Sequence, residues 1–119
     1  MKNDLCDRTF VFAKNVIIFL KHLPCKKEAD VIRYQLARSA TSIGANYEES
    51  QAAFSTEDFK FKLSICFKEA KETNYWLRLI QATELVLNNE IQLLIKESEE
   101  LKNIFGKIVK GLNKGRGKP

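Results

Sequence analysis

RSATSIGANYEES, from Arg38 to Ser50, contains the most informative residues for the fold of this chain. The stretch lies in a segment whose apolar residues recur at helical spacing, yet it is rich in residues that form helices less readily than alanine. These weak helix formers are Ser39, Thr41, Ser42, Ile43, Gly44 and Asn46. At roughly 0.5 kcal/mol for each ordinary residue and about 1 kcal/mol for glycine, the local penalty is on the order of 3 kcal/mol. A helix at this place must therefore be stabilised by packing against its neighbours.

The stretch belongs to a predicted helix from about Glu28 to Ala53, and another predicted helix begins after Ser55. The side chain of Ser55 can cap the free amides of that following helix. Both helices carry a seam of apolar or small residues in alternating steps of four and three, which is typical of packed helices. Because only the short link AFST joins them, we expect the two helices to form an antiparallel hairpin.

The register of this hairpin follows from the position of its turn. A turn in the AFST link pairs positions whose numbers sum to about 109 or 110. The predicted pairs are Leu36 with Thr73, Ala40 with Ala70, Ile43 with Cys66, Tyr47 with Leu63, and Ser50 with Phe59. The small residues Ala40, Gly44 and Ala70 lie on or beside this seam, so the two backbones can approach closely. Small polar residues elsewhere on the helix, such as Thr41 and Ser42, indicate that a further helix or another subunit packs there.

Two more amphipathic segments complete the predicted fold. One runs from about Thr9 to Leu23 and is ended by Pro24, and the other opens at a capping pattern that begins with Asn89. The chain is therefore predicted to be all-α, an antiparallel up-down-up-down four-helix bundle. Residues 1–112 would form the bundle domain, and residues 113–119 a basic, glycine-rich flexible tail.

Charged residues on the predicted hairpin suggest a structural ion pair. In the predicted register Arg38 lies opposite the level of residue 71, within reach of Glu69 and Glu72. We predict that these three residues form an ion pair that fixes the register of the hairpin. The alternative is a solvated charged face.

No catalytic, cofactor or metal site is predicted. His22 is the single histidine, whereas carboxylate-bridged di-iron bundles need a Glu-x-x-His motif from each of two helices. No serine has the surroundings of a nucleophile, and no glycine-rich phosphate loop follows a strand. The cysteines, Cys6, Cys25 and Cys66, are odd in number and far apart, which argues against a disulfide framework and a zinc site. The sequence therefore predicts a protein that is not an enzyme.

Membrane insertion and secretion are also not expected. The longest apolar run, VIIFL at residues 16–20, is far too short to span a bilayer, and no signal-peptide pattern opens the chain. We expect a cytoplasmic protein without a membrane partner.

The formal net charge of +5 is unevenly distributed along the chain. Residues 102–119 contain six basic and no acidic residues, whereas residues 1–101 contain 14 basic and 15 acidic ones. Clustered basic residues bind phosphates in a sequence-independent way by releasing counterions. The candidate nucleic-acid contacts are a stripe on the third helix, Lys60, Lys71 and Arg78, and the C-terminal residues Lys107, Lys110, Lys114, Arg116 and Lys118. The alternative is a solvated tail that aids solubility.

The first helix is apolar around more than half of its circumference, which exceeds what one bundle core covers. Large exposed apolar patches are rare on monomers, so we expect a surface for self-association. The candidate interface residues are Phe12, Ile18, Phe19, Tyr75 and Trp76. The alternative is a wide core face within one subunit.

The run LARSATSIGANYEESQAAFSTEDFKFKLSICFKEAKETNYWLRLI resembles the central signature of a bacterial family, the four-helix bundle proteins encoded by intervening sequences of 23S ribosomal RNA genes. Its members are also called S23 ribosomal proteins. The matching residues are Arg38, Ser39, Ser42, Ile43, Ala45, Asn46, Glu48, Glu49, Ser55, Asp58, Phe59, Leu63, Ser64, Ile65, Glu69, Glu72 and Leu77.

The resemblance implies an up-down-up-down bundle that assembles into a ring-shaped homopentamer. A related protein, the accessory protein of diversity-generating retroelements, is a positively charged barrel that binds a reverse transcriptase and its RNA template. In the present chain the bundle body is near neutral, and the basic residues concentrate in the C-terminal segment. The resemblance therefore implies a non-enzymatic oligomeric scaffold or adaptor for RNA or an RNA-associated partner. The alternative is direct nucleic-acid binding through the basic tail and the third helix.

Overall fold

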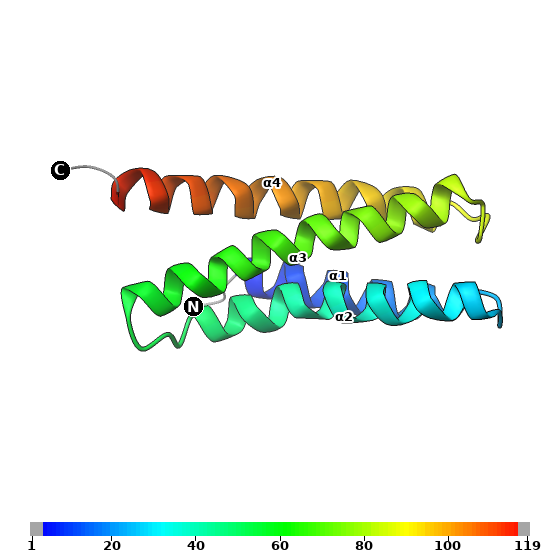
Figure 1. Ribbon diagram of the computed structural model, residues 1–119, viewed down its shortest axis with the longest axis horizontal. Coiled ribbons are helices and arrows are strands. Elements are labelled where there is room, and N and C mark those ends of the chain that lie inside the picture. The colour runs from blue at the N-terminus through cyan, green and yellow to red at the C-terminus, as the bar shows by residue number, and fades with distance from the viewer. Residues whose placement is uncertain (1–3, 117–119) are drawn as a thin grey trace.

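Four helices make up the fold that the computed structural model describes, which covers residues 4–116 with side chains as far as Lys114. The helices are α1 (Asp4–Leu20), α2 (Lys27–Ser50), α3 (Thr56–Ala82) and α4 (Glu90–Arg116). They run alternately in opposite directions along a molecule with Cα extents of 52 × 28 × 23 Å (Figure 1). The predicted all-α, antiparallel four-helix bundle is confirmed.

Each helix packs against two neighbours, so the bundle is a closed square. Helix α2 lies between α1 and α3, and α4 lies between α3 and α1. Within residues 4–116, the diagonal pairs α1 with α3 and α2 with α4 have no close backbone approach. Helix α1 has 17 residues and α4 has 27, so α1 is about 15 Å shorter and covers only part of the bundle's length.

The seam between α2 and α3 has the antiparallel register that the sequence predicts. Ile43 and Cys66 are fully buried, and the thiol of Cys66 donates a hydrogen bond of 3.4 Å to the carbonyl oxygen of Ile43. Further along the seam, the buried hydroxyl groups of Ser39 and Thr73 are hydrogen-bonded at 2.9 Å. These polar contacts occur in only one alignment of the two helices, so they specify the register of the hairpin.

Gly44 contacts a different helix from the one predicted. It was expected on or beside the α2–α3 seam, but it faces α1, where a Cβ atom on Gly44 would lie 3.1 Å from Oγ1 and 3.3 Å from Cβ of Thr9. Ser39 and Gly44 flank the buried position Ile43 on opposite sides of α2, so one meets α3 and the other meets α1. The glycine therefore allows close contact with α1, which is the further helix that the small residues of this stretch indicated.

The helix starts differ in how well the sequence predicts them. The Ser55 side chain accepts a hydrogen bond of 3.0 Å from the backbone N–H of Asp58, so the predicted cap of α3 is confirmed. At α4 the capping oxygen comes from Asn88 and not from Asn89, because the backbone N–H of Glu90 donates to Asn88 Oδ1 at 2.9 Å.

Helix bounds at the two ends of the chain also depart from the prediction. Helix α1 begins at Asp4, earlier than the predicted Thr9, and ends at Leu20, before the predicted Leu23. Helix α4 continues to Arg116, so residues 113–116, which were assigned to a flexible tail, are helical. The rest of the predicted tail, residues 117–119, lies outside the described residues.

Substitution of Gly44 tests the close contact between α1 and α2. Gly44→Leu should lower the free energy of unfolding by about 1–3 kcal/mol, because the new side chain has to displace Thr9 or separate the helices. Gly111→Leu is the matched control, since no heavy atom lies within 4 Å of a Cβ atom built on Gly111. There the better helix propensity should raise stability by up to about 1 kcal/mol. Equal urea midpoints for the two variants would contradict the contact.

Candidate nucleic-acid interface

A basic groove runs between α3 and α4, and we call it the α3–α4 groove. Two residues of α3 and five of α4 line it, namely Phe67, Lys71, Lys102, Asn103, Gly106, Lys107 and Lys110. Its volume of about 500 Å³ lies in the range of sites that hold small organic groups. No carboxylate is among its lining residues within the described part of the chain.

Contact between Gly106 and Phe67 shapes this groove. A Cβ atom on Gly106 would lie 3.0 Å from Cε1 and 3.4 Å from Cζ of Phe67, so only glycine lets the ring approach α4 this closely. The Phe67 ring is half-buried and packs against the hydrophobic core. Lys71, one turn further along α3, holds its ammonium group 5.0 Å from the centroid of that ring, a cation–π contact.

Three lysines of the groove carry charges that no carboxylate neutralises. Lys102 is paired with Glu99 at 2.9 Å. Lys71, Lys107 and Lys110 form no ion pair with any carboxylate of residues 4–114. Like charges gathered in one groove raise the local concentration of anions, and phosphate groups are the anions that such a surface attracts most generally.

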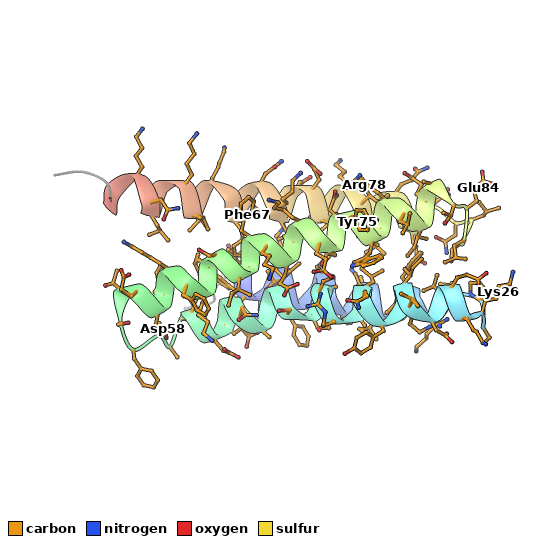
Figure 2. All side chains as sticks on the ribbon, in the orientation of Figure 1. Lys26, Asp58, Phe67, Tyr75, Arg78 and Glu84 are labelled. Atoms are coloured by element: carbon orange, nitrogen blue, oxygen red, sulfur yellow. The ribbon has the colours of Figure 1, made fainter. Side chains whose placement is uncertain are left out.

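The structure thus brings together Lys71, Lys107 and Lys110 from the predicted nucleic-acid contacts. Lys60 lies nearer the start of α3, and Arg78 lies beyond the groove on the same side of α3 (Figure 2). Lys114 is exposed on the last turns of α4. The Arg116 side chain and Lys118 lie outside the described residues.

Sequence reasoning missed the groove residues Phe67, Lys102, Asn103 and Gly106. A signal for the α4 side was present, because Lys102, Gly106 and Lys110 recur at steps of four and therefore share one face of a helix. No comparable signal identified Phe67, since its place beside Gly106 depends on how α3 and α4 align.

The predicted charged cluster on α2 and α3 is assembled in the structure. Arg38 Nη1 lies 3.2 Å from Glu69 Oε2, and Arg38 Nη2 donates to Glu72. Glu69 is only 8% exposed, so its carboxylate needs this partner. Trp76 adds a hydrogen bond of 3.0 Å from its Nε1–H to Glu72 Oε2. The cluster joins α2 to α3, and none of its residues lines the α3–α4 groove.

Two of the residues expected at a subunit interface belong to the core instead. Phe12 is 2% exposed and Phe19 is completely buried, so neither can contact another subunit. The prediction was wrong for these two because the nearly uniform apolar character of α1 hides which face points inward. Trp76 is half-buried on α3, while Ile18 and Tyr75 are exposed.

The apolar surface that α1 does expose consists of other residues. Phe10, Val11, Ile17 and Ile18 are each 41% exposed or more, and we call them the α1 outer face. Each pair, Phe10 with Ile17 and Val11 with Ile18, is separated by seven residues and so repeats on the same side of the helix. Helix α1 therefore carries apolar residues on both its inner and outer faces.

The described residues contain no cluster that suggests metal chemistry, and the buried Cys66 is not an activated thiol. Within residues 4–116 there is no group of three or more His, Cys, Asp or Glu side chains that could hold a metal ion. Burial raises the pKa of the Cys66 thiol to about 12, which keeps this cysteine protonated and unreactive near neutral pH. None of the helices in this part of the chain has the length and apolar character needed to cross a lipid bilayer.

Comparison with known proteins places this bundle in a family. Residues 1–107 match the description 23S rRNA-intervening sequence protein. The chain belongs to this family. A crystal structure of a protein with unknown function from the S23 ribosomal protein family of Bacteroides thetaiotaomicron VPI-5482 is similar to this family member, with 36% sequence identity and a TM-score of 0.79. The similarity covers 88% of this chain and 97% of the other. No curated protein matches this family member.

The charged cluster of this family member should make its stability depend on pH through Glu72. Burial opposes ionisation of Glu72, but hydrogen bonds from Trp76 and Arg38, together with the positive charge of Arg38, outweigh it and lower the Glu72 pKa. The resulting stabilisation is complete above the unfolded-state carboxyl pKa of about 4.3 and is lost as the pH falls through the lower folded-state value.

We therefore expect Glu72→Gln to lower the free energy of unfolding by about 0.5–1 kcal/mol at neutral pH, and by progressively less as the pH drops below about 4. Urea titrations of both proteins across this range would measure the difference. Glu84→Gln, in the exposed loop between α3 and α4, serves as the control and should show no such trend. A loss for Glu72→Gln that stays constant with pH would contradict the lowered pKa.

Proposed function

We propose that this member of the 23S rRNA-intervening sequence protein family is a non-enzymatic, self-associating helical scaffold that holds RNA on the α3–α4 groove. The observation that carries the proposal is the convergence of Lys71, Lys107 and Lys110 on a groove without a carboxylate among its lining residues. Lys71 lies on α3 and the other two lysines lie on α4, so the three charges share one surface only when these helices pack together.

Phosphates of a nucleic-acid backbone fit this surface. Binding them releases condensed counterions, which supplies affinity without any dependence on base sequence. Lysine suits this role because its ammonium is a flexible point charge that does not demand one fixed geometry from its partner. Sequence-independent binding is also what a scaffold needs if it is to hold different stretches of RNA.

Support for the absence of catalysis comes from how the polar residues are used. The thiol of Cys66 is buried and protonated, and the buried carboxylate of Glu69 is paired with Arg38. Ser39, Thr73 and Ser98 form hydrogen bonds within the bundle. Each of these groups has a structural partner, which leaves none of them in the exposed, activated state that a nucleophile requires.

Self-association is supported by the α1 outer face. Phe10 is 63% exposed and Ile18 is 45% exposed, and both lie on a helix whose other face is already in the core. An apolar surface of this kind is stabilised when another copy of the chain covers it. The family resemblance implies a ring of five subunits, in which each copy would present its own α3–α4 groove.

Replacing the three unpaired lysines tests RNA binding. The triple variant Lys71→Gln, Lys107→Gln and Lys110→Gln should weaken RNA binding and reduce the slope of log affinity against log salt concentration by about 2–3 units, since each phosphate contact contributes roughly 0.7–0.9. Fluorescence anisotropy with labelled RNA at several salt concentrations measures both quantities.

A matched control removes the same charge elsewhere. Lys21→Gln, Lys26→Gln and Lys27→Gln alter three exposed lysines in the turn after α1 and at the start of α2. This control should bind RNA nearly as the wild type does. Equal losses for both triple variants would show that net charge, and not the groove, governs binding. Binding of an RNA-associated protein in the absence of any RNA binding would favour the adaptor alternative.

Substitution in the α1 outer face tests self-association. Ile18→Lys should reduce the mass measured by light scattering from near five times that of the 13.7 kDa chain to that of a single chain, because it places a charge in the buried contact. Phe61→Lys, on an exposed site of α3, is the control and should leave the mass unchanged. A wild-type protein that is monomeric at micromolar concentration would contradict this part of the proposal.

A further inference from the structure

Two aromatic residues of α3, Phe67 in the α3–α4 groove and the exposed Tyr75, each lie beside a cation. Lys71 Nζ is 5.0 Å from the ring centroid of Phe67, and the guanidinium carbon of Arg78 is 5.9 Å from that of Tyr75. Figure 2 shows Phe67, Tyr75 and Arg78 following one another along α3. Tyr75 follows Phe67 by eight positions, which at 1.5 Å per residue corresponds to about 12 Å along the helix axis.

Two hydrogen bonds, through the buried side chains of Asn74 and Ser98, connect Arg78 to α4 and hold it in place. Arg78 Nε donates a hydrogen bond of 2.8 Å to Asn74 Oδ1, and Asn74 Nδ2 donates one of 3.0 Å to Ser98 Oγ on α4. Asn74 is 5% exposed and Ser98 is completely buried. Only the Nε–H of Arg78 is used, and its Nη groups donate no hydrogen bond to the described residues. The guanidinium is therefore fixed beside Tyr75 with donors remaining for an external acceptor.

We infer that this surface selects single-stranded over double-stranded RNA. In this arrangement an unpaired base stacks on the exposed ring of Tyr75, and a second base stacks on Phe67 where it borders the α3–α4 groove. Arg78 and the three unpaired lysines of the groove contact the phosphates on either side. The inference rests on the proposed function, to which it adds the class of RNA and the residues that recognise it.

The requirement for a single strand follows from the chemistry of stacking. The bases of a duplex are stacked on one another and paired, so their faces are closed to a protein ring, and the major groove of A-form RNA is too narrow for side chains. Unpaired bases present a free face, and every base can stack on an aromatic ring without regard to sequence.

Exposure makes Tyr75 the decisive residue. Its side chain is 49% exposed, whereas Phe67 is half-buried and packs against the core. The Tyr75 ring contacts the half-buried Trp76, with 5.0 Å between the ring centroids, but it does not belong to the residues packed against the core. Removing it should therefore leave the bundle folded, while a change at Phe67 also alters the packing of α3 on α4. Arg78 keeps its hydrogen bond to Asn74 when Tyr75 is replaced, so the effect of losing the ring can be separated from the effect of losing a charge.

The experiment compares a fluorescein-labelled oligouridine with a blunt RNA duplex of the same length, using anisotropy at fixed salt. Wild-type protein should bind the oligouridine more tightly than the duplex. Tyr75→Leu should weaken oligouridine binding by roughly 5- to 150-fold, the effect of losing one stacked base, and leave duplex binding unchanged. Tyr75→Phe retains the ring and should bind like the wild type. Tyr34→Leu, at an exposed tyrosine of α2, should have no effect.

Two results would overturn the inference while leaving the proposed function in place: equal affinity for the two RNAs, or unchanged oligouridine binding by Tyr75→Leu when the triple lysine variant is impaired. A change of mass for Tyr75→Leu in light scattering would also overturn it, because Tyr75 would then belong to a subunit contact. Failure of the proposed function looks different. In that case the wild type binds neither RNA, or the triple lysine variant binds both as tightly as the wild type.

Discussion

Close approach of helices at residues with little or no side chain is the constraint on which this structure depends. Gly44 brings α2 against Thr9 of α1, and Gly106 brings α4 against Phe67 of α3. Glycine weakens an isolated helix by about 1 kcal/mol, so each of these positions has an intrinsic cost that packing must exceed. The poor helix formers in the middle of α2 are explained in this way. Ser39 meets α3 and Gly44 meets α1, so the same residues that destabilise the isolated helix allow it to be enclosed on two sides.

Hydrogen bonds between the helices specify one alignment of each packed pair. The Ser39–Thr73 contact joins α2 to α3, and the Asn74–Ser98 contact joins α3 to α4. Among the described residues, no buried side-chain nitrogen or oxygen lacks a hydrogen-bond partner. Apolar seams alone tolerate a shift by one turn, whereas a shift here would leave these polar groups without partners at a cost of about 1–3 kcal/mol each. The polar residues of the interior are thus structural, and the charges available for binding are those left on the surface.

The two surfaces that remain available lie on different parts of the bundle. The α1 outer face is made of exposed residues of α1, whereas the α3–α4 groove is lined by residues of α3 and α4. The proposed contact between subunits and the proposed contact with RNA therefore use different residues of one chain. Multiple copies in one assembly would hold several segments of the same RNA, and linked sites of this kind bind far more tightly than each site alone.

The sequence by itself determined the four helices, the hairpin of α2 and α3, and the meeting of Arg38 with Glu69 and Glu72. These features follow from helical periodicity and from a turn too short to permit another alignment, so local rules are sufficient. Only the tertiary structure decided which apolar face of α1 is buried, with Phe12 inside and Ile18 outside, because an almost uniformly apolar helix carries no directional signal. It also decided that Phe67 and Lys71 lie beside the lysines of α4. The loop between α3 and α4 is longer and does not fix how those helices align, so the alignment depends on the packing of Gly106 and on the hydrogen bond between Asn74 and Ser98.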